Sequence, residues 1–268
     1  MPESVTCAAI LAVRNEVLHL RRAIRSFVDS GIDVVIIDHA STDGTLEICK
    51  EYLGNGILSI EHLEWRGVFD LSEQLDFKAQ IIGELPHDWV IHSDADEWLQ
   101  SPVEGESLLE GIIRVDGLGY NAINFDEFVF LPDPDESDIF PDYEKKFLYY
   151  YYFAPQQKRL MRAWKKNCGF SNNAAGGHKL GGIGLNLAPH AFILRHYIAL
   201  SQAHALKKYL GREFSDRDLK KGWHNNRVEI NEENLKLPGT VGLKQLSRWV
   251  AVDFDRSDPK NKHYWEWR

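Results

Sequence analysis

Residues 5–45 of this chain read VTCAAILAVRNEVLHLRRAIRSFVDSGIDVVIIDHASTDGT. Residues 5–13 are apolar throughout and rich in β-forming and small side chains, which is typical of a strand buried on both faces. Apolar residues then recur at helical spacing over residues 16–30, and Gly31 ends the predicted helix. Residues 32–37 form a second buried strand. Strand, helix and strand in this order predict a βαβ unit with parallel strands.

The same alternation continues to about residue 115 and becomes less regular beyond it. We therefore predict an α/β fold with a mostly parallel central sheet, flanked by helices, and an irregular C-terminal half. Further predicted strands cover residues 57–60, 89–92, 120–131, 147–153 and 191–197. Further predicted helices cover residues 45–53, 71–85, 101–115 (with Ser101 as the N-cap), 201–210 and 241–252.

Composition places the chain among ordinary globular proteins. It has 268 residues, of which 44% are hydrophobic and 26% charged, so disorder, collagen and coiled coil are excluded as the dominant state. Three widely spaced cysteines make neither a disulfide framework nor a CxxC metal site, and they suit a reducing compartment. No apolar run is long enough to span a membrane, and the start lacks the basic region of a signal peptide. We expect a cytoplasmic protein, with peripheral membrane contact left open.

Charge is distributed unevenly along the chain. The formal net charge of −9 argues against nucleic acid as a partner. Residues 1–155 hold 10 Lys/Arg and 30 Asp/Glu, whereas residues 156–227 hold 14 and 3, a net charge of +11. The basic segment could close over phosphate charge or face an anionic acceptor. The alternative is a solvated surface of changing sign.

Polar clusters follow three of the predicted strands, at residues 14–16, 38–45 and 94–97. Ligands of parallel α/β sheets bind beyond the carboxyl ends of the strands, so these clusters predict a binding site. Asp94 and Asp96 stand two residues apart where the chain turns, and such carboxylates can converge on Mg²⁺ or Mn²⁺ together with a substrate phosphate. The alternative is a solvated acidic turn.

Asp38 ends the second strand and can accept hydrogen bonds from a base or ribose. Arg14 and Glu16 follow the first strand, where the alternatives are an ordinary ion pair and a first-turn carboxylate that complements the helix dipole. Lys78 lies on the helix before the fourth strand. It is either a phosphate or base contact or a solvated helix lysine.

Three segments, AVRNE (residues 12–16), IIDHASTDGT (36–45) and WVIHSDADEW (89–98), together resemble the family 2 glycosyltransferases of the GT-A fold. The resemblance is strong over residues 5–100 and weak beyond them. It implies a nucleotide-sugar donor of the UDP or GDP type, with Ala12, Arg14, Glu16 and Asp38 holding base and ribose. It also implies that Asp94 and Asp96 bind the metal and the diphosphate.

The resemblance further implies a downstream histidine as third metal ligand, for which His196 is the candidate, against the alternative of a core histidine. Inverting members use a carboxylate to deprotonate the acceptor. Asp126 and Glu127 are the candidates, with Asp142 and Glu144 as alternatives. The family's usual Glu-Asp signature is not visible here. Basic candidates for contact with the diphosphate or acceptor are His178, Arg195 and Lys207.

We therefore expect a glycosyltransferase that depends on Mn²⁺ or Mg²⁺ and transfers a sugar, with inversion, to a hydroxyl of a glycan or lipid-linked acceptor in cell-surface glycan or polysaccharide synthesis. Residues 1–100 would bind the nucleotide sugar, 101–252 would form the acceptor side of the same domain, and 253–268 would be a tail. A nucleotidyltransferase and a non-catalytic nucleotide-sugar or glycan-binding module are the alternatives. Against the former, no Gly-rich phosphate loop with a following Lys stands after the first strand.

Overall fold

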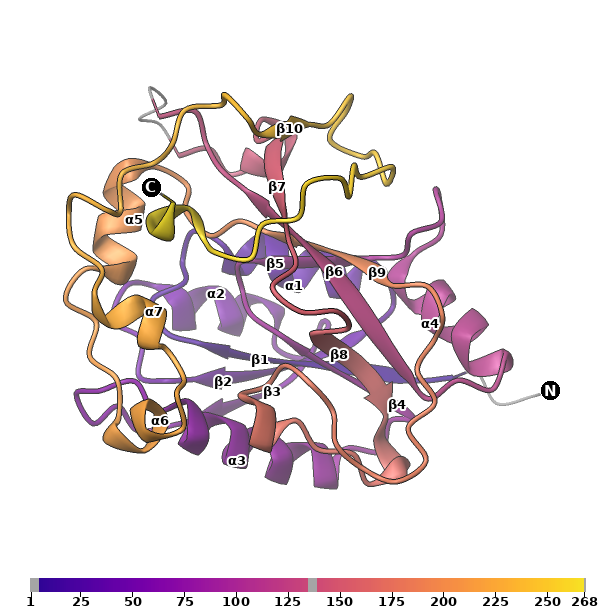
Figure 1. Ribbon diagram of the computed structural model, residues 1–268. Coiled ribbons are helices and arrows are strands. Elements are labelled where there is room, and N and C mark those ends of the chain that lie inside the picture. Colours follow the sequence, from indigo (N-terminus) through magenta and orange to yellow (C-terminus); the bar gives the residue numbers. More distant parts are fainter. Residues whose placement is uncertain (1–4, 135–138, 268) are drawn as a thin grey trace.

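A computed structural model describes residues 5–134 and 139–267. Within these residues the chain folds around one ten-stranded sheet with the order β10-β7-β6-β8-β4-β1-β2-β3, and β9 pairs with both β5 and β6 (Figure 1). The strands are β1 Cys7–Val13, β2 Asp33–Asp38, β3 Ile57–His62, β4 Trp89–Ser93, β5 Glu97–Gln100, β6 Ala122–Phe130, β7 Tyr149–Phe153, β8 Leu160–Lys165, β9 Phe192–His196 and β10 Lys244–Gln245.

The N-terminal half of the sheet is parallel. Strands β3, β2, β1 and β4 run side by side in one direction, as the βαβ pattern predicts. They are connected by α1 Leu20–Val28, α2 Thr45–Tyr52 and α3 Leu71–Glu84. Six of the seven residues of β1 are buried, because helices cover both faces of this part of the sheet. The predicted α/β class is confirmed.

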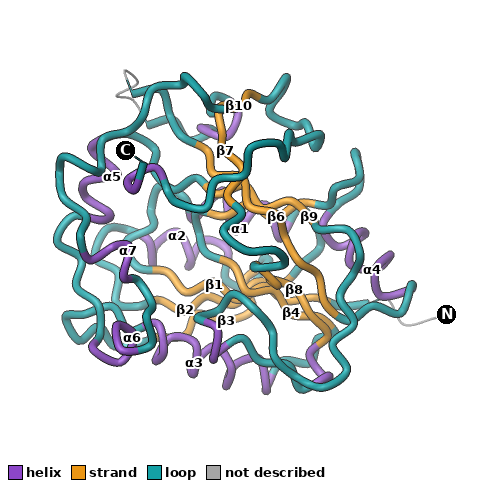
Figure 2. Tube along the Cα trace, viewed as in Figure 1, coloured by secondary structure: helices purple, strands orange, loops and turns teal. Residues whose placement is uncertain are grey.

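The C-terminal half adds antiparallel pairs. Strand β8 runs antiparallel to both β4 and β6, and β9 runs antiparallel to β5. The remaining α-helices are α4 Leu108–Gly117, α5 Gln202–Tyr209, α6 Asp216–Lys220 and α7 Asn225–Val228. The orange helices α5, α6 and α7 lie at the side of the molecule toward which the arrowheads of β1 and β2 point (Figure 1). Loops make up most of the chain after α7 (Figure 2).

The helix predicted from residue 101 begins only after Ser107. The Ser107 hydroxyl accepts from the Glu110 amide at 3.2 Å, and the Glu110 carboxylate accepts from the Ser107 amide at 2.8 Å. This reciprocal capping box satisfies two amides of the first turn. The Ser101 hydroxyl instead accepts from the Val103 amide and contacts Glu106, which closes a local turn.

The helix predicted over residues 241–252 is wrong. Lys244 and Gln245 form β10 against β7, and the Leu246 amide donates to the Leu148 carbonyl at 3.0 Å. Leu246 and Ala251 are buried among the aromatic side chains of β6 and β7. Pairing with a sheet edge thus overrides the helical spacing of the apolar residues. No helix among the described residues is long and apolar enough to cross a membrane.

Candidate active site

The acidic turn after β4 meets the end of β9, which lies about a hundred residues later in the chain. Strand β5 follows the turn and pairs antiparallel with β9, so that Glu97 stands opposite His196. The Tyr197 amide donates to the Asp96 carbonyl at 2.8 Å and closes the junction. Two of the sequence-predicted metal ligands, Asp96 and His196, are therefore brought together.

Asp96, His196 and Glu127 form a buried row. The Nε2 of His196 lies 3.2 Å from Oδ2 of Asp96, and its Nδ1 lies 2.6 Å from Oε1 of Glu127. Burial disfavours the imidazolium, but the two carboxylates hold the pKa of His196 well above its usual value. Burial would raise the pKa of Glu127, whereas Arg159 and His196 hold it well below the usual value.

Lys208 shares the same oxygen of Asp96. It lies near the end of α5, and its Nζ is 2.6 Å from Oδ2 of Asp96. Burial of Asp96 is outweighed by Lys208 and His196, so the pKa of Asp96 lies well below its usual value. The sequence predicts Lys207 as the basic contact, but this residue is exposed and makes no hydrogen bond or ion pair among the described residues. Helix α5 turns the neighbouring lysine toward the carboxylates instead.

Arg162, from β8, stands between Asp94 and Glu97. Its Nη2 lies 3.4 Å from Oδ2 of Asp94 and contacts the buried Glu97 carboxylate. Glu97 also accepts from the Asp94 amide at 3.1 Å, which holds the turn closed. The Asp94 side chain remains 47% exposed, so its carboxylate is the open member of the DxD pair.

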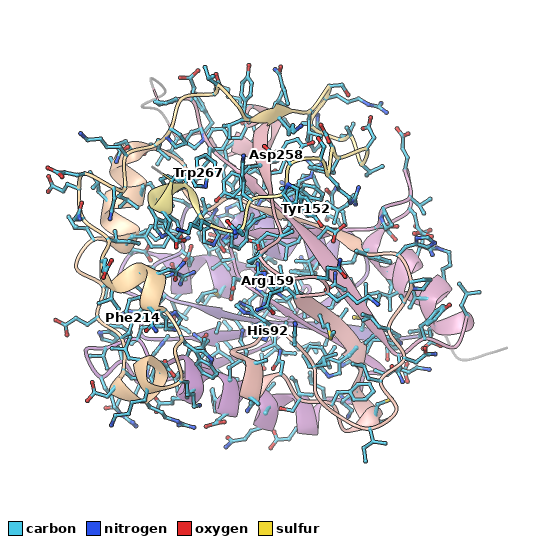
Figure 3. All side chains as sticks on the ribbon, in the orientation of Figure 1. His92, Tyr152, Arg159, Phe214, Asp258 and Trp267 are labelled. Atoms are coloured by element: carbon cyan, nitrogen blue, oxygen red, sulfur yellow. The ribbon has the colours of Figure 1, made fainter. Side chains whose placement is uncertain are left out.

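Lys78 and His92 form a second buried pair beside this turn. The Nζ of Lys78 lies 3.0 Å from Nε2 of His92, and Lys78 is 2% exposed, which excludes a solvated helix lysine. Burial lowers the pKa of Lys78 to about 8. Gly177, at φ +80°, passes so close that a Cβ there would lie 2.8 Å from the His92 ring. His92 and Arg159 lie near the middle of the molecule (Figure 3).

The ends of β1 and β2 form the predicted nucleotide side. Asp38 is buried and both its carboxylate oxygens lie 3.3 Å from the Ser41 amide. Arg14 donates to the His39 carbonyl at 2.7 Å and stacks on Trp65, with 4.0 Å between its Cζ and the ring centroid. Arg14 therefore supports the loop after β2. Ala12, in β1, is partly buried beside the α3 side chains.

Glu16 interacts electrostatically with Asp96 and Asp94 of the acidic turn. Its amide donates to the Thr45 hydroxyl at 2.8 Å. Burial raises the pKa of Glu16 to about 7, partly offset by the charge of Lys208 and reinforced by that of Asp96. Glu16 thus connects the nucleotide side electrostatically with the Asp96 cluster.

The two candidate bases of β6 point to opposite faces of the sheet, because successive strand residues alternate. Glu127 faces His196, whereas Asp126 pairs with Arg256 at 2.8 Å. Asp126 is therefore separated from the cluster. Of the two alternatives, Asp142 pairs with Lys145 at the surface at 3.2 Å, and neither Asp142 nor Glu144 contacts the cluster.

Arg195 precedes His196 in β9, so its side chain lies on the opposite face of the strand from the site. It is fully buried and donates to Gln100 at 2.5 Å and to the Ala251 carbonyl at 2.8 Å, so it holds the C-terminal segment instead of a phosphate. His178 is exposed on a loop, and its own backbone carbonyl accepts from the Met161 amide at 2.8 Å. The preceding carbonyl, that of Gly177, accepts from Arg162 at 3.4 Å, so His178 lies beside the cluster.

Several site residues carry no local sequence motif. Arg22, on α1, donates to the carbonyls of Ala95 and Glu97 at 2.8 and 2.9 Å. These two hydrogen bonds fix the backbone of the acidic turn on both sides of Asp96. Arg159, Arg162 and Lys208 all come from the basic segment 156–227. In the sequence, only the excess of positive charge in that segment indicated that these three residues belong to the site.

The side chains suit a divalent cation in part. Among the described residues no group of three His, Cys, Asp or Glu side chains is arranged to hold a metal. Asp96 and His196 do offer a carboxylate and an imidazole to one point, and Glu127 holds the far nitrogen of His196, as carboxylates behind metal-binding histidines do. Mg²⁺ and Mn²⁺ commonly take one or two protein ligands and complete their shell with phosphate and water. The pair fits that arrangement.

Residues 8–114 match the family model described as Glycosyl transferase family 2. The match covers the three strand-end motifs and confirms their resemblance to this family over that part of the chain. The solved structure of S. aureus TarS 1–349 is similar at a TM-score of 0.42 and 12% identity, over 87% of this chain and 76% of that chain. The same TarS fragment in complex with UDP gives 0.41 and 12%, with the same coverage.

A UDP-glucose pyrophosphorylase complexed with UDP-glucose is similar at a TM-score of 0.29 and 8% identity, over 49% of this chain and 58% of that chain. No curated relative matches the chain in sequence. The similarity to these solved structures is remote.

Proposed function

We propose that this protein transfers a sugar from a nucleoside-diphosphate sugar of the UDP or GDP type to a hydroxyl acceptor, with Mn²⁺ or Mg²⁺ held by Asp96 and His196. The observation that carries the proposal is the buried row of Asp96, His196 and Glu127 at the carboxyl edge of β4. The match to family 2 glycosyltransferases covers the turn that contains Asp96.

The surrounding charges suit a diphosphate. Sugar transfer leaves negative charge on the departing nucleoside diphosphate, and a divalent cation bound there would neutralise it. Lys208 and Arg162 lie against Asp96 and Asp94, and Arg159 lies behind them against Glu127. Asp38 and Glu16 mark the adjacent ends of β1 and β2, where the nucleoside would bind.

Inversion at the sugar carbon is part of the proposal and requires a carboxylate that removes the acceptor proton. Glu127 is poorly suited to this, because Arg159 and His196 hold its pKa well below the usual value. We therefore assign Glu127 the positioning of His196. The acceptor is proposed to be a glycan or a lipid-linked glycan, in cell-surface glycan or polysaccharide synthesis. NMR of the product anomer tests the stereochemistry.

The test is the release of nucleoside diphosphate from a panel of UDP- and GDP-sugars, with Mn²⁺ and with chelator. We expect release, and stabilisation of the protein by UDP or GDP, only with the metal. Asp96→Asn should abolish the metal-dependent release, with melting temperature and circular dichroism as the control for folding.

Equal stabilisation by nucleotide in chelator would contradict the metal role, and so would unchanged turnover of the Asp96→Asn variant. Release of pyrophosphate in place of nucleoside diphosphate would favour a nucleotidyltransferase. Nucleotide-sugar binding without any turnover would favour a binding module.

A further inference from the structure

Lys208 stands where a cation bound to Asp96 would stand. Its ammonium lies 2.6 Å from Oδ2 of Asp96, the oxygen that also faces Nε2 of His196 at 3.2 Å. The side chain of Lys208 is 13% exposed and that of Asp96 is 9% exposed. One buried carboxylate oxygen is thus shared by two cationic groups.

We infer that Lys208 occupies the cation position at Asp96 in the metal-free protein and moves from it to the donor diphosphate when the metal binds. This inference rests on the proposed function. It assigns Lys208 two successive counter-ions, Asp96 and then the diphosphate. The binding of metal and of nucleotide would therefore be coupled through one side chain.

Electrostatics makes the exchange necessary. A divalent cation on Oδ2 of Asp96 would need the position that the Lys208 ammonium now fills 2.6 Å from that oxygen, and its double charge would repel the ammonium strongly in a buried site. Lys208 must then leave Asp96, and a buried ammonium without a counter-ion is costly. The released ammonium needs a new anion within reach of the end of α5.

Glu16 is a second carboxylate whose charge acts on Lys208, and it offers only a weak substitute for Asp96. Burial raises the pKa of Glu16 to about 7, so near neutral pH it is ionised in only part of the molecules. The neighbouring His19 and His204 are neutral, because burial lowers the pKa of both. A donor diphosphate at this edge would supply the missing charge.

The rest of the metal site needs the loss of a proton from Nε2 of His196, which faces Asp96, but no movement of a side chain. Glu127 already holds His196, and Arg22 already holds the carbonyls on both sides of Asp96. The exchange therefore involves one flexible lysine side chain at the end of a short helix. Because coupling between two ligands is reciprocal, nucleotide should raise metal affinity by the same factor by which metal raises nucleotide affinity.

The experiment measures the affinity of Mn²⁺ alone, by electron paramagnetic resonance, and that of UDP and GDP with and without saturating Mn²⁺, by calorimetry. Replacing Lys208→Met removes the competing cation and the diphosphate contact together. We expect Mn²⁺ alone to bind about tenfold tighter and the preferred nucleotide, with Mn²⁺ present, to bind about tenfold more weakly, each a change typical of one charged contact.

Lys207→Met is the matched control, since that side chain is exposed and unpaired among the described residues, and both affinities should be unchanged. Lys208→Gln, which keeps a hydrogen-bond donor to Asp96 without the charge, should behave like Lys208→Met and replaces it if that variant does not fold. Weaker Mn²⁺ binding in both Lys208 variants, or unchanged nucleotide affinity, overturns the inference. A wild-type protein that binds neither Mn²⁺ nor nucleotide overturns the proposed function, and the inference with it.

Discussion

Glu127 and Asp126 are adjacent carboxylates in β6 with different environments. Glu127 is buried against His196 and Arg159, whereas Asp126 contacts Tyr152 and Arg256 on the other face. Both residues carry a carboxylate, so the sequence alone does not show which of the two belongs to the site. The alternation of strand side chains makes only Glu127 a neighbour of the proposed metal ligand.

Replacing Glu127→Gln should weaken Mn²⁺ binding by about 10- to 100-fold, the usual effect of losing the carboxylate behind a metal-binding histidine. Calorimetric titration with Mn²⁺ in the presence of nucleotide measures the effect. Asp126→Asn is the matched control and should change metal affinity less than about twofold, since Asp126 lies on the opposite face. A larger loss of activity in Asp126→Asn than in Glu127→Gln would restore Asp126 as a candidate base.

Burial of the charged Lys78 side chain lowers the free energy of unfolding of the protein. The pKa of Lys78 falls to about 8, so below pH 8 its charge is carried into the interior, which by the shift from 10.5 costs about 3 kcal/mol. Lys78→Met should therefore raise the free energy of unfolding near pH 7 by about 1–3 kcal/mol. Urea denaturation measures this, with the exposed Lys50→Met as a control near zero.

The pH dependence of Lys78→Met has a definite sign. Between pH 8 and 10.5 the folded wild type loses the Lys78 proton while the unfolded chain keeps it, so the wild type gains stability relative to the variant. The advantage of Lys78→Met should therefore shrink across this range. An advantage that is constant with pH would mean that the buried charge is not its cause.

At the scale of elements, the N-terminus of α3 depends on a residue far away in the chain. The Asp218 carboxylate, fully buried, accepts from the Leu71 amide at 2.6 Å and from the Ser72 amide at 3.2 Å. It also accepts from the Ser72 hydroxyl at 2.6 Å. These bonds attach α6 to α3 and position the segment that follows the basic helix α5.

Asp218→Ala should lower the free energy of unfolding by about 2–4 kcal/mol, because three donors at a buried helix end lose a charged acceptor. Urea denaturation measures the change, and hydrogen exchange should show faster exchange of the Leu71 and Ser72 amides. Asp216→Ala lies on the same helix, is exposed, and should cost less than about 0.5 kcal/mol. Equal effects of the two variants would contradict the capping role of Asp218.

Elements of the N-terminal half were predictable because their signals are local. The runs that become β1, β2 and β4 are apolar on both faces, and Pro86 ends α3 within two residues of its last turn. Strands β5 and β8 were not predicted. Each exists through pairing with a partner, β5 with β9 and β8 with β4 and β6, and such pairing leaves no mark in a short window of sequence.

At the scale of the molecule, the segment that matches the family is not an independent unit. Its core includes side chains from later strands, among them Ile123, Phe125, Leu160, Phe192 and Leu194. Strand β4 also loses its β8 neighbour if the chain ends after α4.

A fragment of residues 1–117 should therefore show no cooperative thermal transition and no native near-ultraviolet circular dichroism, whereas the full chain should show both. Calorimetry and circular dichroism of the two proteins, each at several concentrations, check this. Cooperative melting of the fragment with a native-like spectrum would show that the N-terminal half folds alone.

Local pattern in the sequence determined the βαβ order of the first hundred residues, the edge of the sheet where a ligand would bind, and the acidic turn with Asp94 and Asp96. Those features depend on residues close together in the chain, where periodicity and strand-end position suffice. Only the tertiary structure decided that Glu127, His196 and Lys208 join Asp96, and that Asp126, Arg195 and Lys207 do not. Each of those choices depends on which face of a strand or helix a side chain occupies, and on pairings between segments as much as 112 residues apart, which no local pattern encodes.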